Sequence, residues 1–267
     1  MAARYAPRVT QPSTGHGPPF DPSAPPVPPS PAFEAACAEA GLAFEPGELD
    51  RYARYLGFLA DANRRFNLTA VSEPAAMWMR HIYDSLSLLP VIGSMEELAN
   101  SESGLRILDV GSGGGLPGIP LAIALPASRV ALLEATGKKV RFLQTVVEAI
   151  GLRNVTVLQG RAEDLGRDRE HHREQYDLVT SRAVATLPAL LEVTVPFARP
   201  GGFVLAIKGE KAGEEIVAAK AALHALHAHV LEPIRTPTGT IVPIQKMRTT
   251  PKLYPRRAGE PERAPIR

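Results

Sequence analysis

The chain has few of the features that tie a protein to an oxidising compartment or to a membrane. Its 267 residues include one cysteine, Cys37, so no disulfide can form within the chain, and a reducing cytoplasm is the expected location. No apolar run approaches the ~20 residues of a membrane span, and the N-terminus has no apolar segment of a secretory signal. We therefore expect a cytoplasmic protein with no membrane association.

The sequence also lacks a recognisable metal site or hydrolytic triad. Histidines at 171–172 and within 224–229 have no accompanying Cys/Asp pattern, so no metal is expected. His81, Asp84 and Ser85 are spaced to share one face of a helix. A triad is one interpretation of them, but local hydrogen bonding or a contact between parts of the chain is favoured.

A glycine-rich turn after an apolar strand is the most informative motif. The run ILDVGSGGGLPG places Asp109 at the strand end and glycines at positions 111, 113 and 115. Glycine adopts φ > 0 and lets a ligand lie against the backbone, and helix N-terminal N–H groups can face such a ligand. Leu116 stands where a dinucleotide fingerprint would have its third glycine. This pattern favours S-adenosylmethionine (AdoMet) bound by Asp109, Gly111 and Gly113; a turn without a ligand is the alternative.

Two further acidic residues follow the next strands. An apolar strand over 129–134 ends in Glu134, and a strand over 155–159 leads to Arg-Ala-Glu-Asp, which contains Glu163. In a doubly wound sheet the carboxyl ends of such strands meet at one edge. Glu134 is therefore expected to accept the ribose hydroxyls, and Glu163 the adenine amino group. Each acid alone would fit a solvated loop or an N-cap, but three in succession favour a cofactor site.

Composition divides the chain into four parts. Residues 1–31 are rich in proline, which predicts a disordered tail. Residues 32–104 predict an N-terminal helical segment that ends in a linker over 91–104. Residues 105–246 alternate strands and helices, which predicts the AdoMet-binding domain, and residues 247–267 form a basic C-terminal tail.

The alternation after residue 104 predicts the fold. Strands are expected near 105–110, 129–134, 155–159, 176–180, 202–207, 229–234 and 240–246, and helices near 118–125, 137–150, 187–198 and 213–228. Such alternation implies a mostly parallel sheet with helices on both faces. We expect an α/β, Rossmann-like class I AdoMet-dependent methyltransferase with seven strands and an N-terminal helical extension.

The net charge of +2 is unevenly distributed. Residues 246–267 contain seven Lys/Arg and two Glu, whereas residues 32–245 carry a net charge of about −4. A basic terminal segment on an acidic body is typical of proteins that bind phosphate backbones, although a solubilising tail fits the charge equally well. The candidate RNA contacts are Lys252, Arg256 and Arg257 in this segment, and Lys138 and Lys139 at a helix start, where a solvated face is the alternative.

These motifs together resemble the bacterial ribosomal RNA small subunit methyltransferase G family, also called glucose-inhibited division protein B. The resemblance covers residues 45–263 in order and leaves the proline-rich segment unmatched. The matching segments are Asn67-Leu-Thr-Ala, Arg80-His-Ile-Tyr-Asp-Ser-Leu, Asp109-Val-Gly-Ser-Gly-Gly-Gly-Leu-Pro-Gly, Leu133-Glu-Ala-Thr-Gly-Lys-Lys, Arg161-Ala-Glu, Ser181-Arg-Ala-Val-Ala, Lys208-Gly and Thr250-Pro-Lys-Leu-Tyr-Pro-Arg-Arg.

The resemblance implies AdoMet-dependent methylation of a guanine N7 in 16S ribosomal RNA. By motif, Gly111 and Leu116 would line the cofactor turn, and Glu134 would meet the ribose. The pair Ala162-Glu163 would meet the adenine, and Arg182 would lie near cofactor and target in a positioning role. The implied partner is small-subunit ribosomal RNA or the 30S subunit, and a monomer is expected.

The residues agree with this chemistry independently of the family. Cys37 lies outside the predicted sheet, where it cannot serve as the nucleophile of a C5-methyltransferase, and no Asn/Asp-Pro-Pro-aromatic turn follows the fourth strand. Guanine N7 has a free lone pair and needs no general base, only alignment and exclusion of water. The alternatives are a small-molecule methyltransferase and an RNA-binding module with a degenerate pocket.

Overall fold

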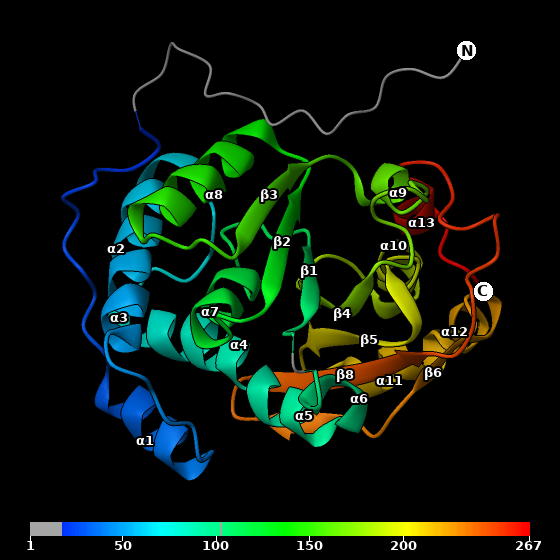
Figure 1. The fold of residues 1–267 in the computed structure, drawn as a ribbon, viewed down its shortest axis with the longest axis horizontal. Coiled ribbons are helices and arrows are strands. Elements are labelled where there is room, and N and C mark those ends of the chain that lie inside the picture. Colours follow the sequence, from blue (N-terminus) through cyan, green and yellow to red (C-terminus); the bar gives the residue numbers. More distant parts are fainter. Residues whose placement is uncertain (1–17, 102) are drawn as a thin grey trace.

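The computed structural model describes residues 18–101 and 103–267 as one sheet with helices on both of its faces (Figure 1). The helical elements before the sheet are α1 (Pro31–Glu39), α2 (Glu48–Phe66), α3 (Pro74–Met77), the π-helical η1 (Trp78–Tyr83), α4 (Asp84–Leu86), α5 (Leu88–Ser94) and α6 (Glu96–Ala99). The later helices are α7 (Gly118–Ala124), α8 (Gly137–Ala149), α9 (Ala162–Leu165), α10 (Leu187–Thr194), α11 (Ala212–Ala218), α12 (Lys220–Ala225) and α13 (Glu260–Arg263).

The strands are β1 (Arg106–Val110), β2 (Arg129–Glu134), β3 (Val155–Gln159), β4 (Tyr176–Arg182), β5 (Ala198–Lys208), β6 (Ala228–Val230), β7 (Ile234–Thr236) and β8 (Gly239–Lys246). They form one sheet in the order β3-β2-β1-β4-β5-β8-β6, and β7 pairs with β8 in addition. The first five strands are parallel, and β8 is antiparallel to β5. The mostly parallel, seven-stranded expectation is confirmed by this continuous order. The single strand predicted over 229–234 is instead divided into β6 and β7. Pro233, between them, has no N–H group to donate to a neighbouring strand.

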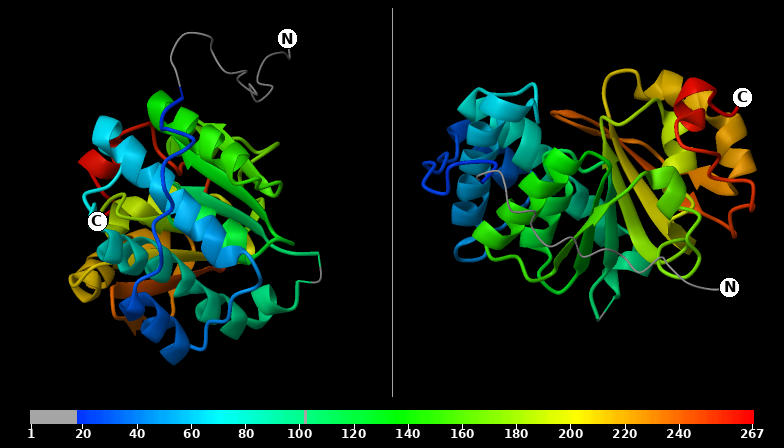
Figure 2. Two further views of the ribbon diagram at one scale, coloured as in Figure 1. Left: turned by 90° about the vertical axis from the view of Figure 1, so that its left-hand side faces the viewer. Right: turned by 90° about the horizontal axis from the view of Figure 1, so that it is seen from above.

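Helices cover both faces of the sheet (Figure 2), and a hydrophobic core lies on each face. On one face α7 and α8 pack against β2 and β3, and α2 packs over both helices. On the other face α10 packs against β4 and contacts α11, α12 and α13. The N-terminal helices share the first core with α7 and α8, so they form a layer of the same packed body as the sheet.

The proline-rich segment differs from the expectation wherever the structure describes it. Phe20 is fully buried and stacks on Phe58 of α2, with ring centroids 4.4 Å apart. The backbone of Val27 donates to α2 at 3.0 Å and accepts the indole N–H of η1 at 3.1 Å. Disorder is therefore the wrong prediction for 18–30, because one aromatic anchor and these bonds fix the segment. The rest of the predicted tail, 1–17, lies outside the described residues.

The predicted linker over 91–104 is also partly helical. It contains the end of α5 and all of α6, and the side chains of Val91, Ile92 and Leu98 are buried. Small and polar residues between these apolar positions obscure their helical spacing in the sequence. The N-terminal layer therefore continues almost to β1.

Candidate functional site

A cleft of about 210 Å³ lies at the carboxyl ends of the parallel strands, where topology predicts the cofactor. We call it the strand-end cleft. Its lining comes from four strand ends, from α10 and from the C-terminal segment: Val110, Gly111, Leu133, Glu134, Ala135, Thr136, Gly160, Arg161, Ala162, Glu163, Val184, Ala185, Ala189, Val193, Pro261 and Glu262.

The glycine turn after β1 bends around the end of β2. The N–H groups of Gly111 and Ser112 both donate to the carbonyl of Leu133, at 2.9 and 3.0 Å. Gly111 has φ +72°, and a Cβ there would lie 2.7 Å from Val184 Cγ2. Both observations require glycine at this position. Gly111 therefore lines the cleft with its backbone alone. The sequence predicts the methionine end of AdoMet at this turn.

Asp109 lies behind this turn rather than on its open side. Its carboxylate is fully buried, accepts from Gly118 N at 3.1 Å and faces Thr180 Oγ1 at 3.4 Å. Burial raises the pKa of Asp109 to about 6, although these hydrogen bonds favour the charged form. The expected direct contact with the cofactor is therefore not the role this geometry supports. Asp109 instead fixes the start of α7 beneath the turn.

Glu134, at the end of β2, has the geometry expected of the ribose acceptor. Its Oε2 accepts from Gly113 N at 3.0 Å, and its Oε1 accepts from Thr136 N at 2.7 Å. The residue is 7% exposed and lines the cleft. A carboxylate has about four lone-pair sites, so each oxygen can accept a further bond from a hydroxyl. The glycine turn is thus tied to the same carboxylate that faces the cleft.

The end of β3 differs from the expectation in its side chain. Glu163 lines the cleft, but its Oε1 accepts from Gly259 N at 2.7 Å and from Arg161 at 3.1 Å. Burial raises the pKa of Glu163, but these hydrogen bonds outweigh it and lower the pKa overall. This carboxylate holds the C-terminal segment against the cleft. Ala162 and Glu163 line the cleft, but the Glu163 carboxylate already has these partners.

Leu116 and Arg182 also lie away from the cleft lining. Leu116 is buried in the core shared with the N-terminal helices, so its role is packing under the turn. Arg182 points from the end of β4 toward η1 and α4. Its guanidinium donates to the carbonyl of Arg80 and pairs with Asp84 at 3.2 Å. The sequence predicts both at the cofactor site, but neither lines the strand-end cleft.

His81 completes this contact between the N-terminal layer and the sheet. Its Nδ1 lies 3.3 Å from Arg182 Nη2, and its Nε2 lies 3.0 Å from Thr69 Oγ1. Burial, and then the nearby Arg182 charge, lower the pKa of His81 to about 4, so the ring is neutral at pH 7. Because the guanidinium can only donate, Nδ1 accepts and Nε2 carries the proton. The arrangement supports the interpretation as a contact between parts of the chain rather than a triad.

The basic C-terminal segment is anchored rather than a loose tail. Arg173 donates to four carbonyls, those of Gly166, Thr250, Pro251 and Tyr254, at 2.7–3.2 Å. Lys246 pairs with Glu174 at 2.8 Å. These anchors could not be predicted, because each joins the C-terminal segment to a residue more than 70 positions away along the chain.

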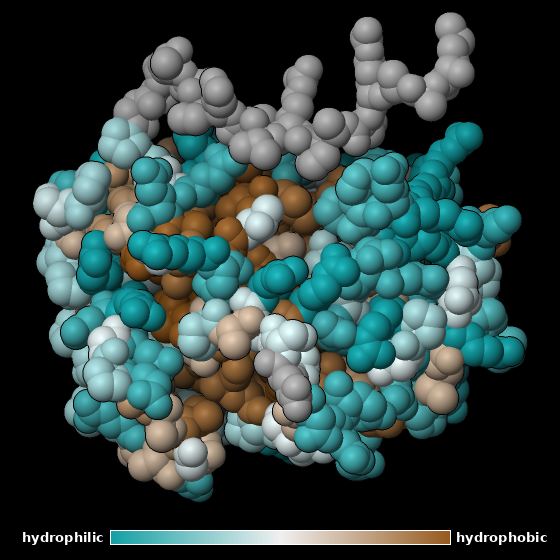
Figure 3. Space-filling view, viewed as in Figure 1, coloured by the Kyte–Doolittle hydropathy of each residue, from teal (hydrophilic) through white to brown (hydrophobic). Residues whose placement is uncertain are grey.

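The candidate RNA contacts separate into two groups. Arg256 donates from Nε and Nη2 to both oxygens of the fully buried Glu192, at 2.7–3.1 Å, so it serves the fold and its assignment as an RNA contact is corrected. Lys252 and Arg257 are exposed, as is Lys138 on the first turn of α8, next to half-buried Lys139. In Figure 3 the surface over α9 and α13 is hydrophilic.

Within 18–101 and 103–267 no cluster of His, Cys, Asp or Glu is arranged to hold a metal ion. None of the helices in these ranges combines the length and apolarity of a membrane span.

The sheet order, the glycine turn after β1 and the carboxylate at the end of β2 define a class I AdoMet-dependent methyltransferase. Solved structures agree on the fold: a Corynebacterium glutamicum protein has a TM-score of 0.51 at 15% identity, and a putative O-methyltransferase from Klebsiella pneumoniae 0.50 at 18%. Each comparison covers 81% of this chain and 97% of the other.

The sequence comparisons then identify the family. The profile of GidB, rRNA small subunit methyltransferase G, matches residues 48–236. Curated relatives named ribosomal RNA small subunit methyltransferase G are 42% identical in Sorangium cellulosum (87% of this chain, 94% of the relative) and 41% identical in Symbiobacterium thermophilum (88% and 96%). The chain belongs to the rRNA small subunit methyltransferase G family, as its motifs predicted, and AdoMet is its cofactor.

Proposed function

We propose that the protein transfers a methyl group from AdoMet to N7 of a guanine in the 16S RNA of the small ribosomal subunit. The family supplies the class of acceptor. The observation that carries the chemistry is the lining of the strand-end cleft. Among the described residues that line it there is no His, Cys, Ser, Tyr or Lys side chain. Of its three carboxylates, Glu134 and Glu163 already accept backbone N–H groups, and Glu262 is exposed to solvent.

That lining suits a nucleophile that needs no activation. The N7 lone pair forms the new N–CH3 bond as the S–CH3 bond of AdoMet breaks, and no proton leaves the base. The protein's own contribution is therefore alignment and the exclusion of water. Glu134 accepts the ribose hydroxyls, Gly111 leaves room for the methionine end, and the backbone at Ala162 meets the adenine.

We infer a second role for the exposed basic residues, which do not line the cleft but belong to segments that do. Lys252 and Arg257 stand on the C-terminal segment whose α13 end borders the cleft. Lys138 follows Thr136, another lining residue. Charges in these places would hold the phosphate backbone while one base reaches the cleft. We expect the enzyme to act as a monomer in the cytoplasm, where ribosomal subunits are assembled.

The test is a comparison of acceptors. Purified protein and labelled AdoMet are incubated with unmethylated small subunits, with naked 16S RNA, with large subunits and with small metabolites. The proposal predicts label in the small subunit or its RNA and none in the other two. Transfer to a small molecule alone would support the small-molecule alternative, and AdoMet binding without transfer to any acceptor would support the RNA-binding module.

A further inference from the structure

The cofactor side and the acceptor side of the strand-end cleft can be separated by topology. The residues assigned to AdoMet follow β1, β2 and β3: Gly111, Glu134 and Ala162. Strand β4 lies on the other side of β1 from β2. The loop 183–186 that follows β4 therefore borders the part of the cleft left for the methyl acceptor, and Val184 and Ala185 line it there.

Val184 is an unusual side chain for such a position. It is 39% exposed, although it is apolar. Four other large apolar side chains are exposed among the described residues, and only Val184 lines the cleft: the others are Val217, Ile234, Met247 and Leu253. Its Cγ2 packs against Gly111, the turn residue assigned to the methionine end. An apolar group is thus held at the methyl-donor end of the cleft and remains accessible.

The loop that carries Val184 is fixed at both ends. Ala183 has φ +55°, a left-handed conformation that is strained for a residue with a Cβ. On one side Arg182 is paired with Asp84 at 3.2 Å. On the other side the carbonyl of Ala185 accepts from Lys208 Nζ at 2.7 Å. Strain of this kind persists only where the surroundings determine the conformation, and it is concentrated at functional sites.

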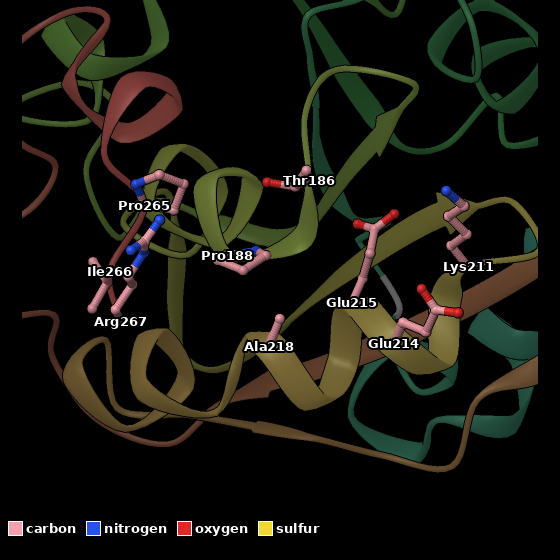
Figure 4. Close-up of a pocket in the computed structure, with 9 residues that line it drawn as sticks. All are labelled: Thr186, Pro188, Lys211, Glu214, Glu215, Ala218, Pro265, Ile266 and Arg267. Carbon is pink, nitrogen blue, oxygen red and sulfur yellow. The ribbon is translucent and has the colours of Figure 1, made fainter.

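A second contact from α11 fixes the end of the loop. Glu215 accepts from Leu187 N at 2.6 Å and pairs with Lys208 at 2.7 Å. Figure 4 shows Glu215 on α11, with its carboxylate toward Thr186, beside a separate groove that the C-terminus also lines. The position of Val184 is thus determined by β4, β5 and α11 together, which is the preorganisation that alignment of a substrate requires.

We propose that Val184 is a substrate-positioning residue, which packs against the flat face of the target guanine and holds N7 toward the methyl group. The inference rests on the proposed function. Enzymes that modify a base hold the extruded base between apolar or aromatic side chains. Val184 also offers no donor or acceptor that would compete for the N7 lone pair.

Three variants of the full chain test this assignment. Val184→Ala removes the contact, Val184→Thr keeps its shape, and Val217→Ala is a matched control on α11, where the valine is 63% exposed and outside the cleft lining. AdoMet affinity is measured by calorimetry, and kcat and KM with unmethylated small subunits at saturating AdoMet. For Val184→Ala we expect kcat/KM to fall on the order of tenfold while AdoMet affinity changes little. Val184→Thr should recover only part of the loss, because it restores the shape but its hydroxyl can donate to the N7 lone pair, and Val217→Ala should match the wild type.

The contrary results are distinct. If Val184→Ala matches Val217→Ala, or if its only change is in AdoMet affinity, the residue does not position the acceptor and the inference is wrong. Tighter AdoMet binding with unchanged kcat would likewise overturn it, because Val184 would then merely obstruct the cofactor. If the wild-type chain places no methyl on small-subunit RNA, the proposed function itself fails and the inference falls with it.

A further variant tests the role of the strained loop. Ala183→Gly removes the cost of the left-handed conformation, so the thermal midpoint should stay the same or rise. The loop should at the same time hold Val184 less firmly, and kcat should fall. A decrease in kcat without loss of stability separates positioning from folding. An unchanged kcat would contradict the view that the strain serves alignment.

Discussion

Replacement of Glu134 is the most informative perturbation of the cofactor site. The carboxylate accepts from Gly113 N and Thr136 N and faces the strand-end cleft. Charge-assisted hydrogen bonds contribute about 1.5–3 kcal/mol each, so loss of two bonds to the ribose in Glu134→Ala should weaken AdoMet binding on the order of 100-fold. The two backbone donors also lose their acceptor, and the free energy of unfolding should decrease by about 1–3 kcal/mol.

The assay measures these two effects separately. Calorimetry gives AdoMet affinity at a temperature where every variant is folded, and urea denaturation gives stability. Glu134→Gln should bind with intermediate affinity, because its amide oxygen still accepts while its NH2 group opposes a backbone N–H. Glu148→Ala is the control, because Glu148 is an exposed acid near the C-terminal end of α8. If Glu134→Ala binds AdoMet as well as the control does, the placement of the ribose is refuted.

Three other predictions concern the layers around the cleft. The double variant Lys252→Ala, Arg257→Ala should keep its AdoMet affinity but bind small subunits more weakly, and the slope of log K against log salt should flatten by up to ~0.7–0.9 per lost phosphate contact; an unchanged slope would leave these residues as a solubilising surface. Arg256→Ala removes the guanidinium from the fully buried Glu192 and leaves it only the backbone N–H of residue 256 as a donor. The variant should lose about 3–5 kcal/mol in urea denaturation; a loss below about 0.5 kcal/mol, typical of surface positions, would contradict the structural role. Arg182→Ala should lower methyl transfer more than AdoMet affinity, because the side chain fixes the end of β4 rather than lining the cleft; an equal loss in both would place it at the cofactor.

The strand-end residues could be predicted because their signals are local. An apolar run that ends in an acid marks the carboxyl end of a strand, and parallel topology brings such ends to one edge. Glu134 meets that expectation in position and burial. Asp109 has the same signal, yet it faces Thr180 and Gly118 behind the turn. The direction of a side chain at a strand end depends on partners that no local pattern reveals.

Long-range pairs explain the other differences. Arg256 has the sequence context of a phosphate contact, but it pairs with Glu192, 64 residues away. Phe20 stands in a proline-rich segment, but it stacks on Phe58. In both cases a single buried contact outweighs the composition of the surrounding segment. In the sequence Val184 is only an apolar residue in the turn after β4. Its position in the cleft lining is visible only in the structure.

The most direct test of the central claim is to locate the methyl group that the enzyme adds. Unmethylated small subunits are treated with the wild-type protein and AdoMet, and the RNA is then reduced and cleaved with aniline, which breaks the chain at N7-methylguanine. We predict one new cleavage site, at a guanine of 16S RNA, which is absent when the protein is omitted. Methyl transfer to the RNA without such a site would place the group on another atom, and would contradict the proposal that this cleft serves a nucleophile in need of no base.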